Sequence, residues 1–245
     1  MRIFFADIRG LFRLDPDSAH GPLSLLLVSM TLVTGLVDAF SYLVLGHVFV
    51  ANMTGNVVFL GFALIGAPGF SITASLVALG SFAAGALTGG RIAAKHAEHR
   101  GRLHSFAATL QAVLLAIAVI LTALGGSPVP AGYRYALIVA LGGAMGVQNA
   151  AARKIAVPDL TTTVLTLTIT GIAADSSLVG GQGSRAGRRL VSVVTMLAGA
   201  VIGAALVLHG QIIYPLAIAF LTIALGAAAS GTLGRSDPAW VHAPS

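Results

Sequence analysis

The chain has 245 residues; 56% of them are hydrophobic, only 9% are charged, and the formal net charge is +6. Soluble domains carry about 25% charged residues, so this chain has too few charges to cover a water-facing surface. The mean hydropathy of +0.92 points the same way. These values exclude a soluble enzyme and predict a polytopic, all-α integral membrane protein.

The first 20 residues precede the apolar part of the chain. Within residues 1–14 the apolar side chains share one helical face, away from the arginines, which predicts an amphipathic helix in the cytoplasmic interface. They are Phe4, Phe5, Ile8, Leu11 and Phe12. A terminal tail without fixed structure is the alternative. The apolar segment that follows is too long for the core of a signal peptide, so we expect it to be a retained first span.

Eight apolar segments follow along the chain, with very few charged residues inside them. A helix needs about 20 apolar residues to cross the bilayer core. We therefore predict six to eight membrane segments in one transmembrane domain, residues 21–230, followed by a tail, residues 231–245. The segments cover residues 23–45, 48–66, 71–93, 104–125, 133–152, 158–178, 189–209 and 211–230.

The second half of the chain resembles the first. We predict two tandem repeats of four segments, about residues 21–126 and 131–230. Internal duplication is common in transporters, whose sites lie where the halves meet. Chance similarity between glycine-rich apolar stretches is the alternative. The matching stretches are residues 35–38 with 146–149, 53–58 with 160–165, and 82–89 with 196–203.

Two Gly-x-x-x-Gly pairs mark candidate close-packing faces. They are Gly85 with Gly89 and Gly199 with Gly203, at matching places in the two halves. Small residues at this spacing let helix backbones approach closely. We expect a structural role for both pairs, with a homodimer through these faces as one form of it.

The distribution of positive charge bears on the topology. If all eight segments crossed, the Lys and Arg residues would divide almost evenly between the two sides. If the second and sixth segments enter and return on the same side, every Lys and Arg except Arg134 lies inside, with both termini. The positive-inside tendency favours the second arrangement, in which the two halves are inverted relative to each other.

The second and sixth segments are also the most polar. Asn52, Thr54, Gly55 and Asn56 interrupt the second, and the sixth begins with Pro158 and contains six threonines. Irregular backbone persists at membrane depth only where protein or a water-filled cavity satisfies it. Broken or re-entrant segments therefore predict a lined cavity, although both segments are long and apolar enough for plain crossing.

Asp38 is the only formally charged residue of the first segment. A carboxylate at the bilayer centre costs at least about 2.5 kcal/mol, so this side chain should face the bundle interior. Thr31, Thr34 and Ser41 lie on the same helical face. The functional interpretation is a proton- or cation-linked carboxylate or a substrate contact. The structural interpretation is an aspartate satisfied by neighbouring helices or by the start of a broken helix.

The fifth segment carries amides, Gln148 and Asn149, at the position that matches Asp38. Amides donate and accept hydrogen bonds without the cost of a charge, which suits recognition of a polar ligand. Hydrogen bonding between helices is the structural alternative, and a threonine can simply bond back to its own helix. The candidate substrate- or ion-binding residues are Asp38, Ser41, Asn52, Thr54, Asn56, Gln148, Asn149, Arg153, Thr161, Thr162 and Thr163.

Motifs of enzyme chemistry are missing from the sequence. It contains no Gly-x-Ser-x-Gly, no His-Glu-x-x-His and no Walker-type loop, and it has no cysteine. We therefore expect no catalytic residues, no metal site and no cofactor. The basic residues lie in short loops without interleaved aromatic residues, so nucleic-acid binding is not expected either.

Three motifs stand out together: Gly35–Ala39, Met53–Asn56, and Gly146–Ala150 with Arg153 and residues 161–163 behind it. The combination resembles the YoaK family, bacterial membrane proteins of unknown function, over about residues 20–230. The resemblance implies a multi-pass protein of the bacterial inner membrane and brings no substrate. The two threonine turns differ, because Leu165-Thr166-Leu167 stands where the first half has a threonine-glycine pair.

The favoured function is a secondary transporter or permease for a small polar solute or ion, with its site near the membrane midplane. Proton coupling through Asp38 is a further hypothesis. A passive channel is one alternative, and a non-transporting membrane scaffold or assembly protein is another. We expect the lipid bilayer and the solute as partners, and both termini in the cytoplasm.

Overall fold

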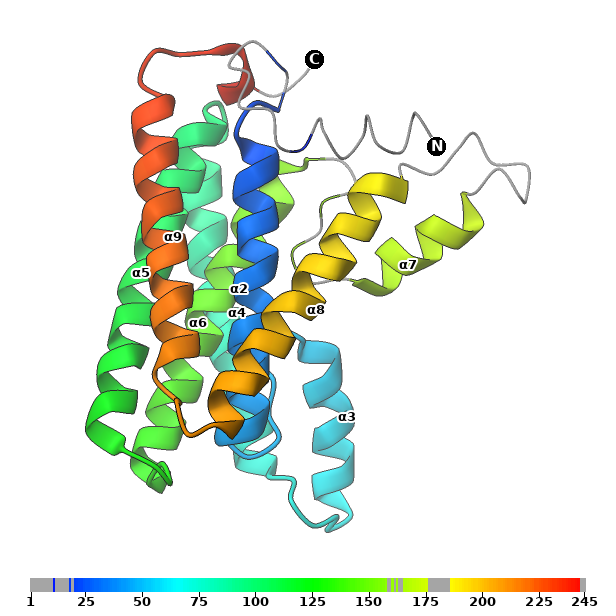
Figure 1. Cartoon of the computed structure of the whole chain (residues 1–245), viewed down its shortest axis with the longest axis vertical. Helices are drawn as coiled ribbons and strands as arrows, with labels where there is room; N and C mark the ends of the chain where they lie inside the picture. Colours follow the sequence, from blue (N-terminus) through cyan, green and yellow to red (C-terminus); the bar gives the residue numbers. More distant parts are fainter. Residues whose placement is uncertain are drawn as a thin grey trace.

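The computed structural model describes residues 11, 18, 20–157, 160, 162, 165–175 and 186–242. The predicted N-terminal segment, residues 1–20, lies almost entirely outside them. The described part is helical and contains no strand, which confirms the all-α class (Figure 1). Its elements are α2 (Leu23–Val44), α3 (Met53–Leu64), α4 (Ile72–Lys95), α5 (Arg100–Gly125), α6 (Ala131–Ile155), α7 (Leu165–Ala174), α8 (Ala186–Leu208), α9 (Tyr214–Leu233) and the 3-10 turn η2 (Ala239–Val241).

Six of the described helices are long and apolar enough to cross a membrane, namely α2, α4, α5, α6, α8 and α9. Their outward faces carry large apolar side chains; Leu124 is 68% exposed, Leu225 70% and Leu208 75%. So much apolar surface is unfavourable in water. Lipid is therefore the solvent for these faces, and the prediction of a polytopic helical membrane protein is confirmed.

Helices α2 and α6 are the most buried of the six and pack closely on partners from the other half of the chain. A Cβ atom at Gly35 of α2 would collide with the backbone of Met196 and Ala200 in α8. Such an approach is open only to a residue without a side chain. The glycine therefore sets the spacing of the α2–α8 pair.

Gly146 makes the corresponding approach in the α4–α6 pair. A Cβ atom there would collide with the backbone of Phe82 and Ala86 in α4. Gly35 and Gly146 occupy matching positions in the two halves of the sequence, and they make matching contacts. The tandem duplication and the inverted orientation of the halves stay predictions.

The two Gly-x-x-x-Gly faces lie inside these same helix pairs. Gly85 lies against Gly143 of α6, and Gly199 lies against Leu32 of α2. Both faces are thus covered by helices of the same chain. A homodimer stays a prediction, and these two faces are not free to form it.

The second apolar segment forms a hairpin that returns to the end it came from. Residues 48–52 have no regular structure, and α3 has 12 residues, about 18 Å of helix, which is short of the ~30 Å core. His47, just past α2, lies 3.0 Å from the carbonyl oxygen of Gly69, just before α4. The hairpin of residues 45–71 therefore enters and leaves at one end of the bundle (Figure 1).

The sixth apolar segment has a similar course at the opposite end. Helix α7 has 10 residues. At the end of α6, the carbonyl of Ile155 accepts a hydrogen bond from Arg100 at 2.8 Å. Past the end of α7, Asp175 pairs with Arg189 of α8 at 2.7 Å. The end of α6 and the start of α8 lie at the end of the bundle where α2 begins and α9 ends (Figure 1), so the chain that joins α6 to α8 leaves and returns at one end.

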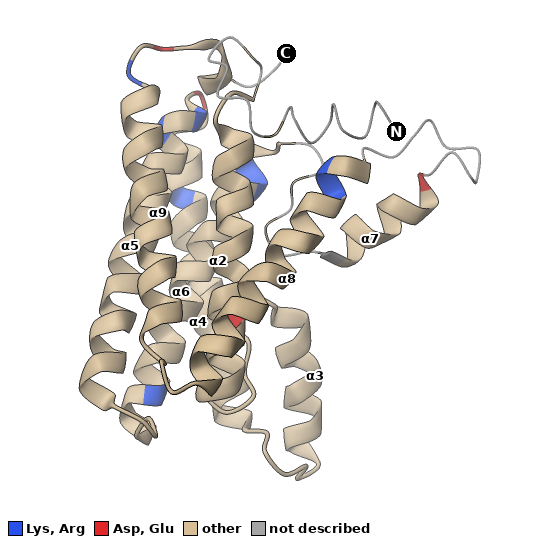
Figure 2. Ribbon diagram, viewed as in Figure 1, with Lys and Arg blue, Asp and Glu red and all other residues tan. Residues whose placement is uncertain are grey.

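Positive charge is gathered at that same end, which we call the basic end. The described Lys and Arg residues belong to the starts of α5 and α8, the ends of α4 and α6, and the segment after α9, as Figure 2 shows. Arg134, at the start of α6, is the exception among them and lies near Gly46 at the far end. This distribution matches the arrangement that the sequence favoured.

Candidate functional site

Asp38 is buried, with 4% of its surface exposed, and it holds the tip of the re-entrant hairpin. One carboxylate oxygen accepts hydrogen bonds from the backbone N–H groups of Val50 at 3.1 Å and Ala51 at 2.9 Å. The other accepts from the Asn52 amide. Irregular backbone at membrane depth needs partners for its N–H groups, and Asp38 supplies them. The geometry thus gives this carboxylate a structural task at the start of α3.

Asn56 fastens the same hairpin from inside α3. Its side-chain oxygen accepts from the backbone N–H of Phe49 at 2.9 Å, and its nitrogen donates to the Phe49 carbonyl at 2.6 Å. Ser41 donates to the carbonyl of Asp38 in its own helix. Thr54 is exposed on the outer side of the first turn of α3. The first-half candidates therefore surround the hairpin rather than an open space.

Aromatic rings pack around this hairpin. Tyr42 stacks on Phe49 with ring centroids 5.2 Å apart, and Phe49 stacks on Phe59 at 5.6 Å. Phe59 in turn lies 5.2 Å from Phe70. Such pairs contribute beyond the burial of their area, so the rings help to fix the hairpin against α2 and the start of α4.

Gln148 lies at the centre of the bundle and joins three helices. Its amide nitrogen donates to the hydroxyl of Thr34 in α2 at 2.9 Å, and its oxygen accepts from the amide of Gln111 in α5 at 2.7 Å. None of the three side chains is exposed. This triad is the interhelical hydrogen bonding that stands as the structural alternative for Gln148.

Three of the second-half candidates line a cavity of about 900 Å³. Asn149, Arg153 and Thr162 all contribute to its wall, together with Lys154. The rest of the lining is apolar and comes from α4, α6, α7 and the chain between α6 and α7, including Phe82 and Leu167 among others. A mostly apolar cleft with a few convergent polar groups is typical of a small-molecule site.

The family profile described as "Protein of unknown function (DUF1275)" matches residues 26–236. The chain belongs to this family. Among curated proteins it is similar to the "UPF0700 transmembrane protein YoaK" of Bacillus subtilis (strain 168), with 35% identity over 154 residues, which is 62% of this chain and 66% of that protein. No solved structure matches the chain. The resemblance inferred from the motifs is confirmed.

In this DUF1275 protein seven of the predicted site residues fall into three groups. Asp38, Asn52 and Asn56 secure the hairpin, Gln148 belongs to the central triad, and Asn149, Arg153 and Thr162 line the cavity. Thr161 and Thr163 lie outside the described residues.

Sequence reasoning missed two buried polar residues of α5. Gln111 completes the triad, and its side-chain oxygen has no hydrogen-bond partner among the described residues. His104 lies 2.9 Å from the hydroxyl of Ser230 through one ring nitrogen, and its other nitrogen has no partner in the described part. The signal was present, because Gln111 is the one amide of an apolar segment and lies seven residues after His104 on the same face.

Proposed function

We propose that this DUF1275 protein is a secondary transporter for a small polar solute. The observation that carries the proposal is the cavity of about 900 Å³ beside the interrupted α6–α7 segment. Its size lies within the range of ligand pockets, about 300–1,000 Å³. The solute would bind there, against the amide of Asn149, the hydroxyl of Thr162 and the cationic Arg153.

The backbone between α6 and α7 supports this assignment. A chain that leaves helical structure at membrane depth is tolerated where it lines a cavity, and Val157, Leu160 and Thr162 of this stretch do so. In known transporter folds, interrupted helices supply the substrate site near the midplane. Two interrupted segments of this kind are present here, one at each end of the bundle.

The distribution of charge supports an orientation with the basic end in the cytoplasm of a bacterial cell, in the inner membrane. The cavity is lined by Arg153 and Lys154 from the last turn of α6, which belongs to the basic end. In this orientation the cationic part of the cavity lining, the start of α2 and the end of α9 lie on the cytoplasmic side.

Proton coupling through Asp38 would act through the hairpin. Every described partner of this carboxylate is a donor, namely the backbone of Val50 and Ala51 and the amide of Asn52. A proton added to the oxygen that accepts from Val50 and Ala51 displaces one of these donors, and a proton on the other oxygen weakens all three bonds by removing the negative charge. Protonation would therefore loosen the hairpin, which gives a physical link between a proton and the shape of the bundle.

A flux assay with purified protein in liposomes tests the proposal. The liposomes are incubated with a defined mixture of isotope-labelled amino acids, sugars, nucleosides and carboxylic acids, and uptake is followed by mass spectrometry. We expect saturable uptake of one chemical class, reduced at least tenfold by Asn149→Ala and Arg153→Ala. Thr222→Ala, on the outward side of α9, is the matched control and should leave uptake unchanged.

The other outcomes are distinct. Uptake that rises linearly with concentration and never exceeds the external level identifies a passive channel. Absence of flux for every class, with the cavity variants indistinguishable from the wild type in every assay, contradicts transport and favours a scaffold.

A further inference from the structure

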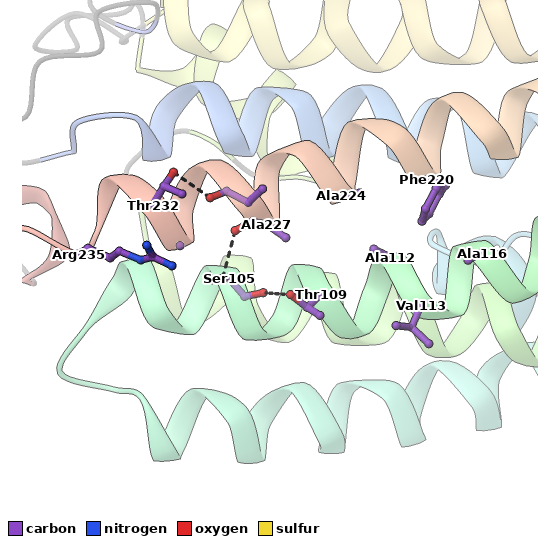
Figure 3. A pocket seen from close by; sticks show the side chains of 12 residues that line it. Ser105, Thr109, Ala112, Val113, Ala116, Phe220, Ala224, Ala227, Thr232 and Arg235 are labelled. Carbon is purple, nitrogen blue, oxygen red and sulfur yellow. Dashed lines mark hydrogen bonds between the residues drawn. The ribbon is translucent and has the colours of Figure 1, made fainter.

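A groove runs along the outer surface between α5 and α9 and ends in a basic pocket. The groove has a volume of about 580 Å³, and Figure 3 shows Phe220 toward one end and Arg235 at the other. Its floor is made mostly of small residues, including Ala112, Ala116 and Ala224. It belongs to neither the cavity beside α7 nor the central triad.

The groove continues into a second pocket of about 290 Å³ at the basic end. Ser105 and Arg235 line both spaces, and the second pocket adds Arg102 and His99. The Arg102 and Arg235 guanidinium groups have no hydrogen bond or salt bridge among the described residues. Two guanidinium groups with no partner among the described residues thus line one pocket at the end of the apolar groove.

The surroundings of this pocket are positive. The pKa of His96 is lowered, first by desolvation and then by the nearby Lys95 and Arg102 charges. Asp237 lies 3.2 Å from His242 and 3.9 Å from His99, and neither Asp237 nor Glu98 lines the pocket. An anionic group between Arg102 and Arg235 would therefore be attracted by both guanidinium groups, and no carboxylate of the lining would compete for them.

The length of the groove fits one leaflet of a bilayer. Ser105 and Ala116 mark its two ends on α5, 11 residues apart, which is about 16 Å along a helix. The hydrocarbon core is about 30 Å thick, so one leaflet occupies about half of that. A groove of this length that begins at headgroup level ends near the middle of the membrane.

We propose that the α5–α9 groove is a specific site for an anionic glycerophospholipid, with an acyl chain along Ala112, Ala116 and Ala224 and the phosphate between Arg102 and Arg235. Basic pockets between helices at a cytoplasmic surface recognise acidic headgroups in this way. The hydroxyls of Ser105 and Thr109 are bonded to backbone carbonyls at 3.1 Å and 2.8 Å. Because these hydroxyl groups already have hydrogen-bond partners, a lipid that covers them leaves no donor unsatisfied. They lie between the position of the headgroup and that of the acyl chain.

Native mass spectrometry of the full chain in detergent tests the proposal. The protein is offered equal amounts of phosphatidylglycerol and phosphatidylcholine with identical acyl chains, and the first lipid retained is counted. We expect preferential retention of phosphatidylglycerol. Each of Arg102→Gln and Arg235→Gln should lower its relative affinity about fivefold.

The matched control is the double variant Arg91→Gln/Lys154→Gln, which removes two exposed cations from the same end of the bundle but none from the groove. It should retain phosphatidylglycerol as the wild type does. Equal losses in the control and in Arg102→Gln/Arg235→Gln would mean that net charge alone attracts the lipid, and the site would be refuted.

A second variant tests the acyl-chain part independently of charge. Ala116→Phe fills the apolar end of the groove and leaves both arginines in place. It should abolish the preference for phosphatidylglycerol while leaving the thermal unfolding midpoint of the lipid-free protein close to that of the wild type. Unchanged lipid selectivity in this variant, or equal retention of both lipids by the wild type, overturns the proposal.

Discussion

The carboxylate of Asp38 accepts a hydrogen bond at 2.9 Å from the backbone N–H of Ala51, thirteen residues further along the chain. Between these two residues the chain leaves α2, reverses direction and runs back toward the middle of the bundle. The bond therefore joins a spanning helix to the tip of a hairpin that has no helical partners of its own at that point. The sequence suggested that Asp38 carries a proton, whereas the structure shows that its carboxylate holds the hairpin in place.

Asp38→Asn should loosen this hairpin. An asparagine offers a single acceptor oxygen in place of two, so at least one buried donor is left without a partner, which costs about 1–3 kcal/mol. We expect a lower thermal unfolding midpoint in detergent and faster thiol labelling of an added Ala51→Cys. Asp237→Asn, an exposed carboxylate outside the bundle, is the control and should change neither. An unfolding midpoint equal to the wild type would refute the anchor.

The central triad should behave as a coupled unit. Gln148→Leu and Gln111→Leu each leave a buried amide without its partner, and each should lower the free energy of unfolding by about 1–2 kcal/mol. The double variant should lose less than the sum of the two, because the second replacement removes the group that the first one orphaned. Strict additivity in a denaturation series would show that the 2.7 Å bond between them contributes nothing.

Replacement of glycine by alanine should lower the free energy of unfolding only where two helix backbones lie in close contact. Gly35→Ala and Gly146→Ala push a methyl group into the backbone of α8 and α4, and each should cost more than about 2 kcal/mol. Gly80→Ala in α4 has open space around it, so it should be neutral or stabilising by up to about 1 kcal/mol through its better helix propensity. Equal effects at all three positions would contradict the close approach of these backbones.

The topology can be read with two single cysteines in this cysteine-free chain. Glu98→Cys precedes α5 and Ser127→Cys follows it, so the spanning helix α5 places them on opposite sides. With the basic end in the cytoplasm, an impermeant thiol reagent added to intact spheroplasts should label position 127 and spare position 98. The reverse pattern would invert the orientation that the positive charges favour.

Much of the architecture could be predicted from the sequence because lipid imposes simple rules. The lengths of the apolar runs predicted the membrane segments. Polar residues at positions 52–56 marked the second segment, whose helix α3 is too short to cross. The roles of individual polar side chains could not be predicted as well. A polar side chain inside the membrane needs partners, but the sequence does not name them: those of Asp38 lie on a hairpin that begins after its own helix, and those of Gln148 lie on two other helices.

The candidate site shows the same limit. The sequence suggested one site formed by both halves, whereas the cavity gathers residues from the second half, with Phe82 and Ala86 of α4 from the first. Periodicity places Asn149 and Arg153 on one face of a helix, but it does not reveal which neighbouring helix leaves space in front of that face. Gln111 and His104 share one helical face, but that periodicity does not reveal which neighbouring helix the face meets.

The crossing of helices between the two halves has a consequence for biogenesis. Gly35 and Gly85 lie in the part of the chain that is synthesised first, and the backbones that they contact, in α8 and α6, are made only later. Newly inserted α2 and α4 must therefore wait in the membrane with their closest-packing faces uncovered. Assembly of the bundle is then a step that follows insertion of the last helices, and a chain interrupted after residue 126 would present those faces to insertases, chaperones and membrane proteases.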